Sequence, residues 1–181
     1  MKKQKLGFTL IEVLLVVGFV ATGTLAVLIV SNIADRYGKA ATETANIHAL
    51  AEAVWKGPGI MGFYPVVSNA GMNNSNFTPE TMRDPSNASR IVNGFGSDIN
   101  VTPATYVNSY GITYNGFNIA TTNIPFNYCS KIVSDAGGDF DQISVQGTIV
   151  KAVTASDVDP ATMAVACSSA TNVTITFTSF Q

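Results

Sequence analysis

The strongest pattern along the chain is an uncharged apolar run close to its N-terminus. Residues 13–30 read VLLVVGFVATGTLAVLIV and contain no charged side chain. Together with residues 8–11, this run is long enough to cross the roughly 30 Å hydrocarbon core of a membrane as a helix. Lysines stand before it at positions 2, 3 and 5, so the positive-inside rule predicts that the C-terminal bulk of the chain lies outside the cytoplasm.

A helical pattern continues beyond the apolar run. Apolar and small residues recur at three- and four-residue spacing and predict one buried helix face, formed by Ile33, Tyr37, Ala41, Thr44, Ile47, Ala51 and Val54. The charged residues of this stretch fall largely off that face, namely Asp35, Arg36, Lys39, Glu43 and Glu52. Gly57-Pro58-Gly59 predicts the end of the helix. We therefore predict one helix over residues 8–56, whose apolar half projects and requires a membrane or further copies of the chain.

The rest of the chain is polar and mixes strand and helix signals. Residues 66–109 are rich in Asn, Ser, Thr, Gly and Pro, and predict a long loop with short helices such as one at residues 79–84. Asn115-Gly116, flanked by two β-prone segments, predicts a β-hairpin. Helices are predicted from Pro125 to the Gly137-Gly138 pair and over residues 160–167, and strands within residues 142–153 and 173–178.

Composition agrees with this division and excludes one class of partner. Hydrophobic residues are 46% of the chain and charged residues only 12%, against a usual charged share of about 25%. The net charge is −2, and the basic residues after the lysine-rich start are scattered rather than clustered. A nucleic-acid-binding surface needs clustered positive charge, so nucleic acid is not expected as a partner.

Two cysteines, Cys129 and Cys167, leave two possibilities open. An even number of cysteines in an exported domain favours a disulfide. The alternative is a pair of buried free thiols.

Glu12 separates three interpretations of the N-terminal segment. A secretory signal peptide or a plain signal anchor has no use for a carboxylate near the start of an apolar span, where it costs roughly 2–3 kcal/mol at bilayer depth. A signal peptide would also end at a small-residue cleavage site followed by a break, whereas Ala21-Thr22-Gly23 is followed by further apolar sequence. The third interpretation gives the carboxylate a role.

Residues 5–13, KLGFTLIEV, resemble the type IV prepilin signature: a basic leader, Gly7, a hydrophobic first mature residue at Phe8, and Glu12 four residues later. The resemblance implies that a prepilin peptidase cuts after Gly7 and that the new amine of Phe8 is N-methylated. It also implies that Glu12 pairs with the Phe8 amine of a neighbouring subunit and fixes the register of assembly. A paired buried charge is tolerable, whereas an unpaired one is costly.

The C-terminal part resembles the type IVb subclass of these pilins. The resemblance rests on NGFG at residues 93–96, GFNI at residues 116–119, CSKI at residues 129–132, and a second cysteine before a terminal strand. In that subclass the two cysteines staple the C-terminal region to the sheet. The implied fold is α+β: a long N-terminal helix packed on an antiparallel sheet, the pilin αβ-roll, with one disulfide. The implied divisions are a leader at residues 1–7, a transmembrane or filament-core half-helix at residues 8–32, and a globular domain at residues 33–181.

The function expected from the resemblance is structural. The chain would be the major subunit of a type IV pilus, held in the inner membrane with its C-terminal domain in the periplasm and then assembled into a helical surface filament. Its partners would be other copies of itself, the prepilin peptidase and the inner-membrane assembly machinery. A minor pilin or type II secretion pseudopilin remains an alternative, as does a signal-anchored periplasmic binding protein or enzyme.

Residues that could carry enzymatic or metal chemistry are few. His48 is the single histidine, so the chain cannot form a multi-histidine metal site, and we expect His48 to pack on its own domain. The acidic turn Asp135-Ala-Gly-Gly-Asp139-Phe-Asp141 lacks the ligand pattern and closing glutamate of an EF-hand, and predicts a helix-to-strand turn. We therefore expect neither a catalytic residue nor a cofactor or metal.

Overall fold

The computed structural model of the chain describes residues 9–59 and 64–180, apart from the side chains of residues 22–33. It divides into two compact units, residues 1–36 and residues 37–181. Gly7 and Phe8, the predicted cleavage and methylation residues, lie outside the described residues.

The long helix predicted from the N-terminal pattern is confirmed. Helix α1 spans Leu10–Val54 without interruption, and a short π-helical turn, Trp55–Gly59, follows it. That turn contains the predicted stop signal, because Pro58 has no backbone N–H with which to continue a helix.

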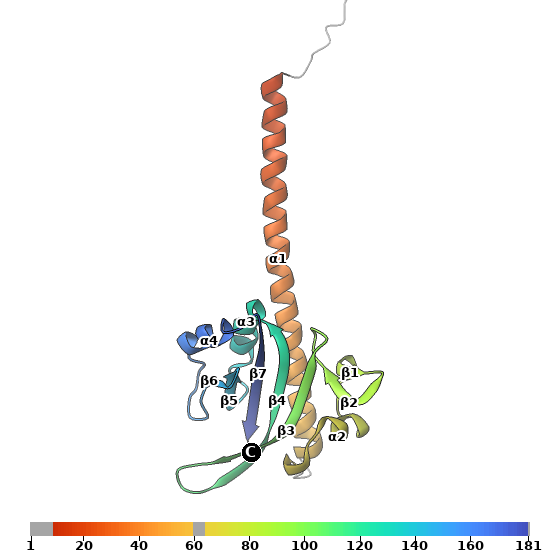
Figure 1. The fold of residues 1–181 in the computed structure, drawn as a ribbon, viewed down its shortest axis with the longest axis vertical. Coiled ribbons are helices and arrows are strands. Elements are labelled where there is room, and N and C mark those ends of the chain that lie inside the picture. Colours follow the sequence, from red (N-terminus) through yellow and green to blue (C-terminus); the bar gives the residue numbers. More distant parts are fainter. Residues whose placement is uncertain (1–8, 60–63, 181) are drawn as a thin grey trace, which may run out of the picture. The chain divides into compact units, whose positions relative to one another are not determined.

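One antiparallel sheet is the centre of the second unit (Figure 1). Within the described residues it has seven strands in the order β1-β2-β3-β4-β7-β5-β6. The strands are β1 Arg83–Asp84, β2 Asn87–Val92, β3 Asp98–Val107, β4 Thr113–Pro125, β5 Gln142–Val145, β6 Thr148–Lys151 and β7 Asn172–Phe180. The terminal strand β7 lies between β4 and β5, so the end of the chain joins the middle of the sheet.

The C-terminal part of α1 packs on one face of this sheet. The side chains that α1 buries there include Ile47, Leu50 and Val54, each with no exposed surface. Phe117 of β4 meets them from the sheet, and its ring contacts the ring of Trp55 edge-on at 6.1 Å. Burying such side chains is worth about 1.5–3 kcal/mol each, so this interface contributes to the stability of the second unit.

Shorter helices complete the second unit, and a disulfide links two of them. The helices are α2 Asn69–Asn74, α3 Phe126–Ala136 and α4 Pro160–Cys167, with 3₁₀ turns at Tyr64–Val66 and Glu80–Met82. Cys129 of α3 and Cys167 of α4 form the disulfide, which confirms the first of the two possibilities left open above. Both cysteines are buried, so the bond holds the two helices together inside the core.

Three local predictions were wrong. Residues 66–109 are not mainly loop, because they contain β2 and β3. Asn115-Gly116 is not a hairpin turn but lies inside β4, and the chain turns at residues 108–112 instead. Among the described side chains of α1, the buried face begins at Ala40, whereas Tyr37 and Ala41 are exposed; the side chain of Ile33, also predicted on this face, lies outside the described residues.

Gly116 explains the misplaced hairpin. A Cβ atom at this position would lie 1.9 Å from the carbonyl oxygen of Ser179 on β7, so the glycine is needed for close approach of two strands. Gly116 is therefore required for the packing of β4 against β7, and it does not mark a turn.

Candidate assembly site

Glu12 lies in the first turn of α1, where it caps the start of the helix. The backbone N–H of Thr9 donates to Oε2 of Glu12 at 3.3 Å, and the Thr9 hydroxyl donates to the same oxygen at 3.4 Å. Thr9-Leu10-Ile11-Glu12 therefore has the sequence of a capping box, in which the acid three residues into the helix satisfies the N–H of the capping residue. The negative charge also favours the positive end of the helix dipole.

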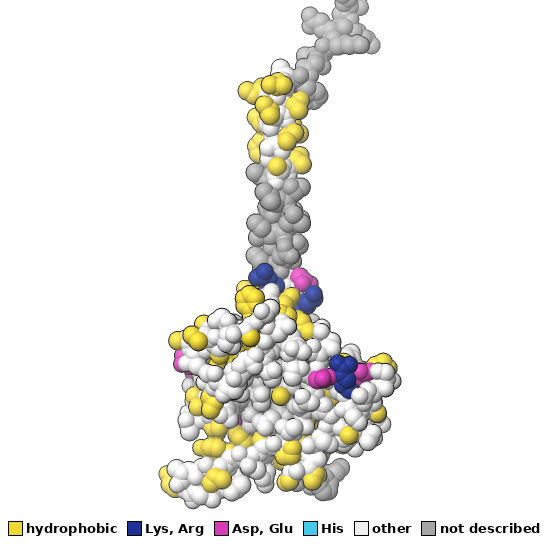
Figure 2. Space-filling view, in the orientation of Figure 1, with side chains coloured by type: hydrophobic (Ala, Val, Ile, Leu, Met, Phe, Trp, Pro, Cys, Tyr) yellow, Lys and Arg dark blue, Asp and Glu magenta, His cyan; other side chains and the backbone are white. Residues whose placement is uncertain are grey.

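An apolar surface surrounds this carboxylate. The hydrophobic side chains of α1 from Leu10 to Val20 are exposed, for example Leu10 at 82% and Phe19 at 71% (Figure 2). Exposed apolar patches larger than a few hundred Å² mark sites of contact with a membrane or with other proteins. Among the described side chains, the first turns of α1 therefore expose an apolar surface with a single charge, that of Glu12.

In the part of the chain whose residues are described, no helix is long and apolar enough to cross a membrane.

A second glutamate of α1, Glu43, is buried in the second unit and fixes a turn of the sheet. Its side chain is only 1% exposed. The backbone N–H of Gly94, in the turn between β2 and β3, donates to Oε2 of Glu43 at 2.7 Å, and the hydroxyl of Thr121 on β4 donates to Oε1 at 3.2 Å. Burial is the main cause that raises the pKa of Glu43 above its usual value, and these hydrogen bonds partly oppose it.

The turn that Glu43 holds is stabilised from inside by Asn93. Its Oδ1 accepts the N–H groups of Phe95 and Ser97 at 3.0 and 2.9 Å, and its amide donates to the hydroxyl of Thr121 at 3.0 Å. The NGFG segment at residues 93–96 thus joins α1, the β2–β3 turn and β4 through one polar network. The sequence pattern placed Glu43 among the solvent-facing charges and missed this role, because helical spacing does not distinguish a buried carboxylate with partners from an exposed one.

The groups considered for enzymatic or metal chemistry have structural contacts. His48 stacks on Phe140 with the ring centroids 5.8 Å apart, and its Nε2 lies 3.6 Å from Oδ2 of Asp139. The turn after α3 is held by Lys151, whose ammonium donates to the carbonyl oxygens of Gly137 and Phe140 at 2.6 and 2.8 Å. Among the described side chains, no group of three or more His, Cys, Asp or Glu could hold a metal ion.

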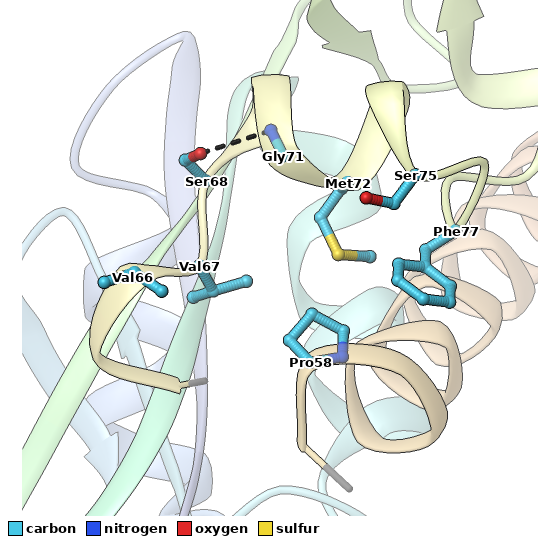
Figure 3. Close-up of a pocket in the computed structure, with 8 residues that line it drawn as sticks. All are labelled: Pro58, Val66, Val67, Ser68, Gly71, Met72, Ser75 and Phe77. Carbon is cyan, nitrogen blue, oxygen red and sulfur yellow. Dashed lines mark hydrogen bonds between the residues drawn. The ribbon is translucent and has the colours of Figure 1, made fainter. Parts of the chain in front are cut away.

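An apolar pocket of about 470 Å³ lies near the C-terminal end of α1 (Figure 3). Pro58, Val67, Met72 and Phe77 line it, and the Gly71 N–H donates to the Ser68 hydroxyl at 3.3 Å across its rim. Residues 60–63, which connect two of the segments lining the pocket, lie outside the described residues. We therefore assign no ligand to this pocket.

Comparisons with known proteins identify the class of fold. A type IVb pilin from Salmonella typhi is 24% identical, with a TM-score of 0.53, and the match covers 76% of this chain and 97% of that one. TcpA, a type IV pilin from Vibrio cholerae El Tor biotype, is 13% identical with a TM-score of 0.54, covering 78% and 98%. No curated protein sequence matches the chain. These structures show that the fold is that of a type IV pilin, similar to the type IVb members.

The family follows from the sequence itself. A family model described as "PilS: PilS N terminal" matches residues 37–180, which is well over half of the chain. The chain belongs to the PilS family. The expected α+β fold and the resemblance to type IVb pilins are thereby confirmed.

Proposed function

We propose that this chain is the major structural subunit of a type IV pilus. In this proposal it is cleaved after Gly7, methylated on Phe8, held in the inner membrane by residues 8–32, and then polymerised through its N-terminal helix into a surface filament. The family and the fold are those of structural subunits, which favours this function over an enzymatic one.

The observation that carries the proposal is the exposed apolar surface at the start of α1, with Glu12 as its one charged side chain among the described residues. A helix that is apolar on all sides is stable when lipid or other helices cover it. The sequence of residues 13–30 supports a membrane as the first of these environments and a filament core as the second.

In a filament, helices of neighbouring copies would enclose Glu12, and its carboxylate would then require a positively charged partner. Removing a carboxylate from water is costly unless an opposite charge lies against it. No Lys or Arg stands between Glu12 and Arg36, so the cation within reach of this end of the helix is the amine that cleavage would create on Phe8. In the proposal this amine comes from a neighbouring copy, so that each pair fixes the offset between two subunits.

The proposed processing can be tested on protein sheared from the cell surface. Mass spectrometry should find a chain that begins at Phe8 and carries one methyl group on its amine. A surface protein that keeps Met1, or one cut after Ala26, would contradict the proposal. The quantity recovered separates a major subunit, which is abundant, from a minor pilin or a pseudopilin.

A further inference from the structure

Three aromatic rings gather at one end of the sheet, on the face that points away from α1. Phe117 faces α1, so the alternation of side chains along β4 puts Tyr114 and Gly116 on the opposite face. Tyr106 of β3 is the direct partner of Tyr114, and Phe180 of β7 is the direct partner of Gly116. The three rings therefore share one face of the sheet. Figure 1 shows that the β3–β4 turn and the C-terminal end of β7 lie at the same end of the sheet.

The rings of Tyr106, Tyr114 and Phe180 lie side by side on one face of the sheet, and we call this group the platform. The centroids of Tyr106 and Phe180 are 5.6 Å apart with the ring planes at 38°, and those of Tyr106 and Tyr114 are 6.3 Å apart at 33°. Gly116 lies on the strand between Tyr106 and Phe180 and has no side chain to separate them. The ring planes are tilted relative to one another, but the three rings share one face of the sheet and together present an apolar surface to a ligand that is itself flat on one side.

Polar groups stand at the edge of the platform. The rings line a pocket of about 330 Å³ together with Asn108, Asp141 and Thr154, which is a volume within the range of small-ligand sites. Oδ2 of Asp141 accepts the backbone N–H of Phe180 at 2.7 Å, and the N–H of Asp141 donates to the carbonyl of Thr178 at 3.0 Å. The backbone thus holds the Asp141 carboxylate beside the rings. Its Oδ1 accepts no hydrogen bond from the described residues.

We propose that this pocket binds a neutral saccharide, with one pyranose ring stacked on the platform and its hydroxyl groups donating to Asp141. A pyranose has a flat face of C–H groups and a rim of hydroxyls, which matches an apolar platform with a charged acceptor at its edge. Hydrogen bonds to an ionised acceptor are about twice as strong as neutral ones. Anionic sugars do not fit, because the described residues that line the pocket include an acid and no Lys or Arg.

A small organic cation is the competing ligand chemistry. Aromatic rings and a carboxylate also attract quaternary ammonium groups, which bind over ring faces. The position of all three rings on one face of the sheet favours the sugar, since the rings offer one surface and do not enclose a cation. Saccharide binding at this site is independent of filament assembly, so its failure would leave the proposed structural role untouched.

The test uses the full-length chain in micelles of a detergent without sugar or ammonium groups, such as an octaethylene glycol dodecyl ether. Saturation-transfer NMR would be recorded with the methyl pyranosides of glucose, galactose, mannose and N-acetylglucosamine, and with tetramethylammonium. At least one pyranoside should receive saturation on its ring protons. Tyr106→Ala should weaken that binding about tenfold or more, and Asp141→Asn, which keeps the side-chain shape, about tenfold.

Tyr110→Ala is the matched control, because Tyr110 is on the same hairpin, is 87% exposed and does not line the pocket. It should bind the pyranoside as well as the unchanged chain does. Near-UV circular dichroism would confirm that each variant is folded, and Asp141→Asn carries the test if Tyr106→Ala does not fold. The proposal is overturned if no pyranoside binds, if tetramethylammonium alone binds, or if Tyr110→Ala loses as much affinity as the pocket variants.

Discussion

Replacing Glu43 tests whether this buried carboxylate holds the β2–β3 turn against α1 and β4. Glu43→Ala would leave the N–H of Gly94 without its acceptor, 2.7 Å away in the present structure. An unsatisfied buried backbone donor costs about 1–3 kcal/mol, and the empty volume adds to that cost. Glu43→Gln keeps an acceptor for the same N–H and should change the free energy of unfolding at neutral pH by less than about 1 kcal/mol.

Both variants should also differ from the unchanged chain in the pH dependence of stability, because neither carries the Glu43 carboxyl group. Burial raises the pKa of Glu43 above 4.5, so the folded chain binds this proton more tightly than the unfolded chain does. The stabilisation from this group is fully present below the unfolded pKa and is lost as pH rises through the raised folded pKa. The free energy of unfolding should therefore fall with rising pH in that window. Glu43→Gln and Glu43→Ala should each remove this part of the pH dependence.

The single tryptophan, Trp55, provides the assay, because its ring packs on Phe117 in the interface that Glu43 helps to hold. Urea unfolding of the oxidised full-length chain in micelles would be followed by Trp55 fluorescence between pH 4 and pH 8. Glu52→Ala is the matched control on the same helix, since Glu52 is exposed and pairs only with Lys56 among the described contacts. It should change stability by less than about 0.5 kcal/mol. A Glu43→Ala variant as stable as Glu52→Ala would refute the reasoning.

Two further predictions concern the covalent link and the strand packing. Alkylation of the unfolded but unreduced protein should label neither Cys129 nor Cys167, whereas stoichiometric labelling would show free thiols. Replacing both cysteines by serine should lower the free energy of unfolding by about 3–4 kcal/mol, because the disulfide joins residues that are 38 positions apart. Gly116→Ala should lower the free energy of unfolding by at least about 1–3 kcal/mol in urea, because the added Cβ atom would clash with the Ser179 carbonyl. Gly138→Ala is the control and should be nearly neutral, because the space around Gly138 is open. Equal effects of the two substitutions would argue against the close approach of β4 and β7.

The elements with a strong local signal were predictable from the sequence. The apolar periodicity and the Gly57-Pro58-Gly59 stop predicted α1 to within a few residues. Helix α4 was also predicted with the observed bounds. It begins with Pro160 in the first turn and an Asp159 side chain that accepts the N–H of Ala161 at 3.0 Å, which is a local device that the sequence displays directly.

The features that depend on distant partners were not predictable. Strands β2 and β3 are rich in polar residues, and they form because neighbouring segments supply their hydrogen bonds; for example, Asn69 of α2 bonds to the backbone of both Ile99 and Val101. The burial of Glu43 likewise depends on Gly94 and Thr121, which are 51 and 78 residues away along the chain. Tertiary context overrides local pattern at both places.

For Glu12, the role implied by the sequence resemblance differs from the contact seen in the structure. The prepilin resemblance assigned it a partner in a neighbouring subunit, whereas the described contact is local, to the N–H of Thr9. Thr9 and Glu12 have the spacing of a capping box, which is visible in the sequence, whereas the prepilin resemblance concerns the charge of Glu12. Glu12 can serve both as a helix cap and as a partner for a Phe8 amine, but only the pairing with the amine requires its negative charge.

The most direct measurement of the central proposal is therefore the yield of surface filaments from Glu12→Gln. Glutamine can replace glutamate in a capping box, so this variant keeps the cap on Thr9 and removes only the charge. Glu12→Ala removes both, and together the two variants separate capping from charge pairing. Assembly by pairing with a neighbouring Phe8 amine predicts normal amounts of cleaved protein in the membrane and few or no filaments from either variant, by shearing and electron microscopy. Wild-type filament yield from Glu12→Gln would contradict the account, because it would show that assembly does not use the charge of Glu12.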